Sequence, residues 1–359
     1  MWRRAETGVM DKPHFWKTTL AEQQEILGAV KKGKTKTIAK SAGSRDLFLV
    51  EYSEKQDFGG TANYSSACGA GSPKYYADKT GKKPVIFLIG AIHAAELEGT
   101  SALLNLINMI ETGTDFRGYK APFLSDCANR CRLLIVPIAN PDGRARGIPD
   151  MVRGLSYEDF RHYGQGRWKD GSLCEWPQCK TVHPIKEHVS FLGSYYNDDG
   201  INMMHDYFFG NMANETKALF DTSETEAPDF TILLHGGDNT VNVILDTAYA
   251  PLFIKEQIRD LSLRIKAEAD TQNLPYRETK IQADDSFPPR SFNLASALHH
   301  ACGTVSLVYE SNQGIDCEKK EGETILSYDE ILTQHYILFE QTIRYAIERN
   351  AQGGKNNEA

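Results

Sequence analysis

The sequence predicts an α/β fold in which a single mixed, twisted sheet is covered by helices on both faces. Three observations lead to this prediction. The chain has 359 residues, of which 41% are hydrophobic, so it can bury a large core. It contains continuous apolar runs of about four to eight residues, which are typical of strands covered on both faces. Between them lie stretches whose apolar residues follow the helical period, and one sheet between two helical layers accommodates both patterns.

Strands and helices can be assigned in chain order. The candidate strands are Asp46 to Tyr52, Val85 to Ile89, Arg132 to Ile138, Phe230 to Leu234, Asn242 to Leu245 and Val305 to Tyr309. The two clearest helices are Thr100 to Ile110 and Tyr328 to Ile347, each with an apolar stripe on one face. We expect residues 1–350 to form one domain and the polar tail, 351–359, to be disordered.

The region from about Arg144 to Gly200 has a different character. It is rich in Gly, Trp, His, Cys and charged residues and shows no sustained period. We predict a long surface excursion here. Long loops of this kind are often functional.

Charge and cysteine content limit the classes of partner and the compartment. A formal net charge of -8 argues against a nucleic-acid-binding surface and favours a peptide or small-molecule partner. The N-terminal MWRRAETGV lacks an apolar signal region, and no stretch reaches the roughly 20 apolar residues of a membrane span. Seven scattered cysteines argue against a complete disulfide framework, so we expect a reducing, cytoplasmic setting unless an export signal has been trimmed from the sequence. The sequence leaves the oligomeric state open.

Ionisable and polar residues follow four of the predicted strands. His93 and Glu96 come after the strand ending at Ile89, His235 closes the run FTILLH, and Glu310 follows Tyr309. Asn140 to Gly143 follows a fourth strand. Ligands of open α/β sheets bind beyond the carboxyl ends of strands, so we expect these residues to converge.

The spacing of His93 and Glu96 suits a metal ion. Two residues three apart on a helical turn point to the same side, so an imidazole and a carboxylate can reach one ion. Zinc accepts both ligand types, and a catalytic zinc keeps three protein ligands with a fourth position for water. His235 is the candidate for the third ligand, because Gly236 and Gly237 leave space beside it.

Other metal or catalytic motifs are not supported. Cys174, Cys179 and His183 lack the spacing of a completed zinc motif, so we interpret the cysteines as thiols or a local disulfide. HPIKEH is one residue too long for an H-x-x-E-H motif. The chain also contains no H-E-x-x-H, G-x-S-x-G or Walker A sequence.

The motifs HAAE (93–96), NPDG (140–143), His235 and Glu310, in this order and at these separations, resemble those of the zinc carboxypeptidases of the carboxypeptidase A-like family. The stretch KTIAKSAGSRDLFLVEYS is similar to that family's first two strands, and the resemblance extends from about Lys36 to Ile347. It implies a mixed sheet of about eight strands in one domain. It also implies one Zn²⁺ per chain held by His93, Glu96 and His235, with Glu310 as the general base. The implied reaction is hydrolysis of an amide near the C-terminus of a peptide or peptide-like substrate.

This sequence departs from the family where substrate is bound. The family's Asn-Arg pair, which grips the terminal carboxylate, corresponds to Met204 and His205, and an imidazole lacks the fork of permanent charge that arginine offers. Asn202 stands where the family has an aspartate that orients a zinc-bound histidine. Its amide oxygen can still accept that hydrogen bond.

Two arginines are candidates for further roles in the family's substrate site: anchoring the terminal carboxylate and stabilising the oxyanion. The family's mobile tyrosine has no match in DDSFPPRSFN, where Arg290 is the long cation that we expect to anchor the carboxylate. For the arginine that stabilises the oxyanion, Arg167 is the first candidate and Arg161 the second.

The sequence thus predicts a zinc metallocarboxypeptidase. One rival is an amidohydrolase acting on N-acyl amino acids or cell-wall peptides. The other is a zinc-containing binding protein without turnover, which the presence of Glu310 disfavours because a binder needs no general base.

Overall fold

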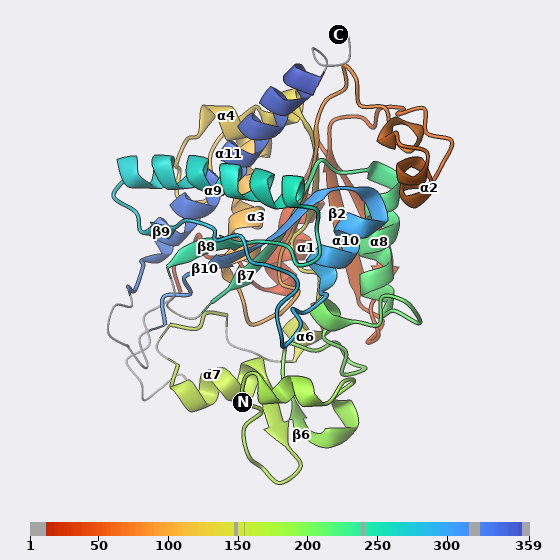
Figure 1. Cartoon of the computed structure of the whole chain (residues 1–359). Coiled ribbons are helices and arrows are strands. Elements are labelled where there is room, and N and C mark those ends of the chain that lie inside the picture. The colour runs from red at the N-terminus through yellow and green to blue at the C-terminus, as the bar shows by residue number, and fades with distance from the viewer. Residues whose placement is uncertain (1–11, 147–149, 154, 238–240, 316–323, 354–359) are drawn as a thin grey trace.

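An eight-stranded mixed sheet runs through the centre of the molecule (Figure 1). The computed structural model describes residues 12–146, 150–153, 155–237, 241–315 and 324–353, and the strand order is β1-β2-β4-β3-β7-β10-β8-β9. The strands are β1 (Lys34–Lys40), β2 (Asp46–Tyr52), β3 (Val85–Ile89), β4 (Arg132–Val136), β7 (Phe230–Gly236), β8 (Asn242–Leu245), β9 (Tyr276–Arg277) and β10 (Val305–Ser311). The central strands β4, β3, β7 and β10 are parallel, and β2 and β8 are antiparallel to β4 and β10. The predicted fold class is confirmed.

Helices cover both faces of this sheet. They are α1 (Leu20–Gly28), α2 (Tyr64–Gly69), α3 (Glu98–Thr112), α4 (Pro122–Ser125), α5 (Cys127–Arg130), α6 (Pro141–Ala145), α7 (Tyr157–Gly164), α8 (Asn214–Glu226), α9 (Leu252–Thr271), α10 (Leu294–Cys302) and α11 (Tyr328–Gly353). In Figure 1, α9 and α11 lie on one side of the sheet and α8 and α10 on the other. Within the described residues, no helix is both long and apolar enough to cross a membrane.

The two helical layers explain why the central strands are apolar throughout. Successive residues of a strand point to opposite faces. On β7, Ile232 and Leu234 belong to the core shared with α3, α9 and α11, whereas Leu233 belongs to the core shared with α8 and α10. Both sets are buried, so no alternation with polar residues survives.

Several element boundaries differ from those predicted. β7 continues to Gly236 and β10 to Ser311, so His235 and Glu310 lie within the last residues of their strands. Backbone pairing with neighbouring strands extends both beyond the apolar run. Helix α11 continues to Gly353, so residues 351–353 of the predicted tail are helical; residues 354–359 lie outside the described residues.

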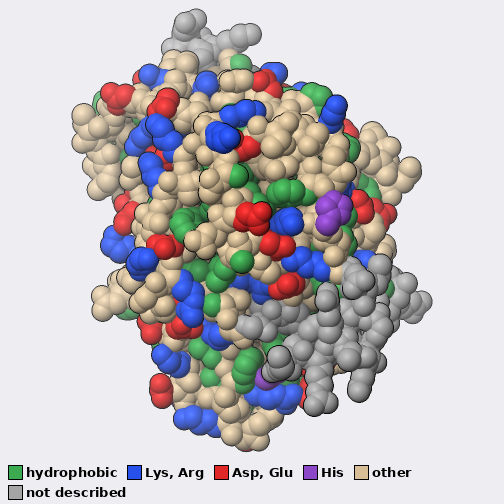
Figure 2. Space-filling view, turned by 180° about the vertical axis from the view of Figure 1, so that it is seen from behind, with side chains coloured by type: hydrophobic (Ala, Val, Ile, Leu, Met, Phe, Trp, Pro, Cys, Tyr) green, Lys and Arg blue, Asp and Glu red, His purple; other side chains and the backbone are tan. Residues whose placement is uncertain are grey.

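The region 144–200 is more regular than its sequence pattern indicated. It contains α7 and a two-stranded sheet of β5 (Gly166–Trp168) and β6 (Val189–Leu192), seen at the bottom of Figure 1. Buried side chains such as Phe160, Ile185 and Tyr196 join this excursion to the main core. On the face in Figure 2, basic and acidic side chains are intermixed.

Candidate active site

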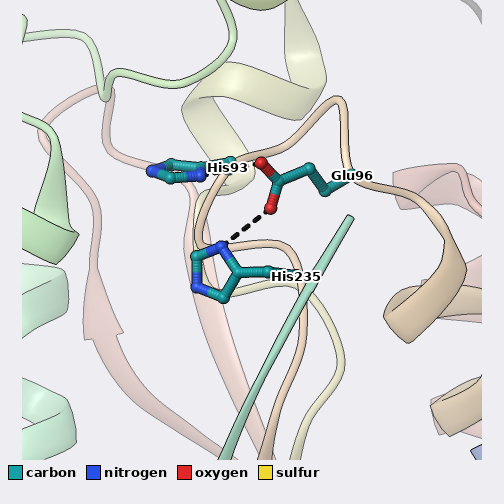
Figure 3. A group of neighbouring side chains, drawn as sticks. All are labelled: His93, Glu96 and His235. Carbon is teal, nitrogen blue, oxygen red and sulfur yellow. Dashed lines mark hydrogen bonds and ion pairs between the residues drawn. The ribbon is translucent and has the colours of Figure 1, made fainter. Parts of the chain in front are cut away.

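Three buried side chains meet beside the carboxyl ends of β3 and β7. His93 follows β3, Glu96 precedes α3, and His235 lies on β7 (Figure 3). The Glu96 carboxylate bridges the two imidazoles, with Oε1 2.9 Å from Nδ1 of His93 and Oε2 2.8 Å from Nδ1 of His235. One ligand atom from each residue lies within 4.8 Å of the others. The structure thus brings together the three residues predicted to bind zinc.

The His93 ring is fixed from two sides. Its Nε2 lies 3.1 Å from Oδ1 of Asn202, and the ring stacks on Tyr195 with centroids 4.1 Å apart and planes 2° apart. Asn202 Oδ1 also accepts a hydrogen bond from the Met204 backbone N–H, which establishes this atom as the acceptor. His93 Nε2–H therefore donates to Asn202, and this orients Nδ1 towards Glu96.

Burial and charge act in opposite directions on Glu96 and His235. Burial disfavours the Glu96 carboxylate, but the two imidazoles outweigh it and hold the Glu96 pKa well below its ordinary value. Burial likewise disfavours protonation of His235, but the Glu96 carboxylate raises the pKa of this imidazole. The backbone N–H of Gly236 adds a hydrogen bond to Glu96 Oε2 at 3.2 Å. Glu96 is thus kept ionised, the state in which it can bind a cation.

The cluster fits a zinc ion. Two imidazoles and one carboxylate are a zinc donor set, and Nδ1 of each histidine faces the same carboxylate. Nε2 of His235 is buried and has no hydrogen-bond partner among the described residues, so none of these holds the ring in another orientation. The three ligand atoms thus surround a point that one ion can occupy.

The cluster lies at the base of a cleft of about 290 Å³. Glu310 lines the same cleft and is the register partner of His235 on the neighbouring parallel strand. Arg161, Tyr195 and Trp176 enter it from the excursion. The predicted convergence of His93, Glu96, His235 and Glu310 is therefore seen in the structure.

The two predicted arginines lie elsewhere. Arg167, on β5, forms an ion pair with Glu158 and donates to the Gly171 carbonyl, and it is not among the lining residues of the cleft. Arg161, the second candidate, lies on α7 and does line the cleft. The sequence could not separate the two, since the end of α7 and the start of β5 lie between them.

Arg290 also lies outside the lining of the cleft. Its guanidinium group binds Asp246 at 2.8 Å and Asp284 at 2.9 Å, and the Asp246 side chain is only 1% exposed. These ion pairs speak against the predicted carboxylate-binding role, because the charge of Arg290 is already neutralised within the protein.

His205 does not supply the missing positive charge itself, but it forms a hydrogen bond with a charged residue, Lys180. Its Nε2 accepts from the Lys180 ammonium at 2.8 Å, so Nδ1–H donates to the Ser291 hydroxyl at 3.2 Å. Burial and the charge of Lys180 lower the pKa of His205 to about 3, which keeps this imidazole neutral. Lys180 lies over the Trp176 ring, 3.7 Å from its centroid, at the edge of the cleft. No signal in the sequence singled out Lys180.

The remaining motifs have structural roles. Asn140 caps α6, and Asp142 accepts from Ser41, Gly43, Arg45 and the backbone N–H of Asp198, which ties the end of the excursion to the start of the sheet. Cys174 and Cys179 are buried thiols without a disulfide. His183 accepts a hydrogen bond from the Asn202 backbone N–H at 2.8 Å, so it supports the residue that orients His93.

Solved structures of known proteins share this fold. The structure is similar to a metallo-carboxypeptidase from Burkholderia cenocepacia, with 13% identity and a TM-score of 0.57, covering 91% of this chain and 68% of that one. It is also similar to carboxypeptidase A from Helicoverpa armigera, with 16% identity and a TM-score of 0.54, covering 95% of this chain and 75% of that one. At these identities the likeness shows the fold. No curated protein sequence matches the chain.

The sequence itself matches a family model. The match is to the zinc carboxypeptidase family and spans residues 31–352, which include His93, Glu96, His235 and Glu310. The chain therefore belongs to the zinc carboxypeptidase family of metallopeptidases.

Proposed function

We propose that the protein is a zinc-dependent carboxypeptidase that releases a C-terminal residue from a peptide or peptide-like substrate. One observation carries this proposal. Glu310 is the register partner of His235 and lines the same cleft as His93 and Glu96, so a carboxylate stands beside the three-residue cluster. That is the arrangement that metal-assisted hydrolysis requires: three protein ligands that leave a position for water, and a separate base.

The roles of the cluster follow from its chemistry. His93, Glu96 and His235 hold the ion, and Asn202 orients His93 through its Nε2–H. Zinc, when bound, acts as a Lewis acid and lowers the pKa of a water molecule. Glu310 takes the proton of the attacking water and delivers it to the leaving nitrogen. Tyr195 covers one face of the His93 ring and keeps solvent from it.

Arg161 is our candidate for stabilising the oxyanion. It is a permanent cation in the same cleft as the cluster, whereas Arg167 is paired with Glu158 outside it. A positioned cation is most effective where negative charge develops on the carbonyl oxygen. We therefore assign to Arg161 the role that the sequence first suggested for Arg167.

Lys180 is our candidate for binding the terminal carboxylate. Its ammonium is held by neutral His205 and the Trp176 ring at the edge of the cleft. His205 thus contributes indirectly, by positioning Lys180. A lysine offers a single point charge in place of the arginine fork, so we expect the terminal carboxylate to contribute less to specificity than a bidentate pair would.

The proposal is tested with zinc-loaded wild type, Glu310→Gln and the matched surface variant Glu25→Gln, each with its zinc content measured. General-base catalysis contributes about 10²- to 10⁴-fold, so Glu310→Gln should lose activity by that factor while keeping its zinc. Glu25 is exposed and is not among the lining residues of the cleft, so its variant should match wild type. If neither wild type nor Glu310→Gln hydrolyses peptides although both bind zinc, the protein would be a binding protein instead.

A second substrate panel separates the two hydrolase interpretations. It contains peptides with free C-termini, the same peptides amidated, and N-acetyl amino acids. A carboxypeptidase cleaves the free series and fails on the amidated one. Equal cleavage of the amidated series, or turnover of N-acetyl amino acids alone, would contradict the carboxypeptidase and support an amidohydrolase.

A further inference from the structure

Four residues form a single row across the C-terminal half of the sheet. His235 on β7 pairs with Glu310 on β10, Glu310 with Val243 on β8, and Val243 with Arg277 on β9. All four line the cleft that contains the metal cluster. Neighbouring strands are about 4.8 Å apart, so Arg277 stands roughly 10 Å from Glu310 along the row. One amino-acid residue of a substrate, together with the Glu310 and Arg277 side chains, fills a gap of this length.

The Arg277 guanidinium group is uncommitted within the described part of the chain. It forms no hydrogen bond, ion pair or ring contact there, and the residue is exposed. Arg290 provides the contrast, because its guanidinium group is held by Asp246 and Asp284. An arginine that lines a cleft and lacks an internal acid can bind an acid that arrives with the ligand.

The other walls of the cleft fit the same kind of ligand. Val243 and Leu245 on β8, next to Arg277, offer apolar surface for methylene groups, and Leu245 is 39% exposed. Charge also favours an anion: the lining contains two arginines, Arg161 and Arg277, and two glutamates, Glu96 and Glu310. Their formal charges cancel, so a bound divalent cation leaves the lining positive in a protein whose net charge is -8.

We propose that Arg277 binds the side-chain carboxylate of an acidic residue immediately C-terminal to the scissile amide, so that the enzyme releases C-terminal glutamate or aspartate in preference to other residues. This inference rests on the proposed function and names its substrate class. Val243 and Leu245 pack against the methylene groups of that side chain, and Arg277 pairs with its carboxylate at the outer end of the row.

The test uses acylated dipeptides that differ only at the last residue, Glu, Gln or Lys, together with the Glu dipeptide as its C-terminal amide. The proteins are zinc-loaded wild type, Arg277→Met, Arg277→Glu and the control Arg259→Met, which removes an exposed arginine of α9 that pairs with Glu278 outside the cleft lining. A site built around a polar partner discriminates strongly, so wild type should prefer Glu over Gln by about 10- to 100-fold in kcat/KM.

In Arg277→Met that ratio should fall to near one, because the Glu substrate loses its partner while the Gln substrate does not. Arg277→Glu should reverse the preference in favour of Lys, and Arg259→Met should behave as wild type. Equal rates of wild type on Glu, Gln and Lys would overturn the inference while leaving the hydrolase intact. An Arg277→Met defect of equal size on Glu and Gln substrates would also overturn it, since it would assign Arg277 to the terminal carboxylate.

A binding measurement separates this inference from the proposed function. Calorimetry compares N-acetyl-glutamate with N-acetyl-glutamine on wild type and Arg277→Met. If wild type cleaves no peptide but binds N-acetyl-glutamate at least tenfold tighter, and Arg277→Met does not, the acidic site stands and the hydrolase assignment fails. Equal binding of the two ligands to wild type would contradict the acidic site whatever the activity.

Discussion

The central sheet and the excursion at residues 144–200 contribute to the cleft in different ways. The sheet places His235 and Glu310 by backbone pairing between parallel strands, and His235 is only 4% exposed. The excursion contributes Arg161 and Trp176, which make ring contacts with Tyr157 and Lys180, and Lys180 is in turn hydrogen-bonded to His205. Residues placed by strand pairing are thus fixed by the backbone of the sheet, whereas those of the excursion depend on individual side-chain contacts.

The largest effect expected from the excursion concerns Arg161. Arg161→Met should lower kcat by about 10²- to 10³-fold, because it removes a cation from the cleft where charge develops. Arg167→Met should stay close to wild type, since its ion pair with Glu158 lies outside the cleft lining. Steady-state kinetics on one dipeptide, with zinc content checked, gives both values. The opposite ranking would restore Arg167 as the oxyanion residue.

A smaller effect is expected where the two regions meet, at Asn202. The Asn202 side chain orients His93 without touching an ion, and losing such a partner typically costs about 10- to 100-fold in metal affinity. Asn202→Ala should weaken zinc binding by this factor, while Asn202→Asp should match or exceed wild type. Titration against a competing chelator measures it, with the exposed Asn129→Ala as control. Unchanged affinity in Asn202→Ala would remove the orienting role.

Zinc affinity should also fall as the pH falls. The pKa of His235 in the metal-free protein is raised by Glu96, so His235 carries a proton below that raised pKa, and zinc must displace it. Glu96 stays ionised because its pKa is lowered, so it contributes no such dependence. Releasing one proton gives about a tenfold weaker affinity per pH unit below the His235 pKa. Chelator competition over a pH series would show this slope, and a flat profile would contradict it.

Arg290 provides the case in which catalysis should not change. Arg290→Ala should leave KM unaltered, since the guanidinium group is committed to Asp246 and Asp284. The same substitution should lower the free energy of unfolding by roughly 3 kcal/mol, because Asp246 remains buried without its arginine. Urea denaturation and KM measured on the same preparation check the two halves. A raised KM with unchanged stability would return Arg290 to substrate binding.

The same contrast explains what the sequence could predict. The buried strands and the helices α3 and α11 were visible as apolar patterns, and residues at strand ends such as His235 and Glu310 could be placed because parallel strands end at one edge. The two-residue strand β9, which carries Arg277, is too short to show a period. Lys180 is hydrogen-bonded to His205, 25 residues away in sequence, and Arg161 lies in a region without a sustained period, so the positions of both became apparent only in the folded chain.

The central claim is that His93, Glu96 and His235 hold one zinc ion together. Zinc content is the most direct test: wild type, His93→Ala, Glu96→Ala and His235→Ala are loaded with zinc, dialysed and analysed for metal, with circular dichroism to verify folding. We predict one zinc ion per chain in wild type and almost none in each folded variant. Full zinc content in all three variants would contradict the account.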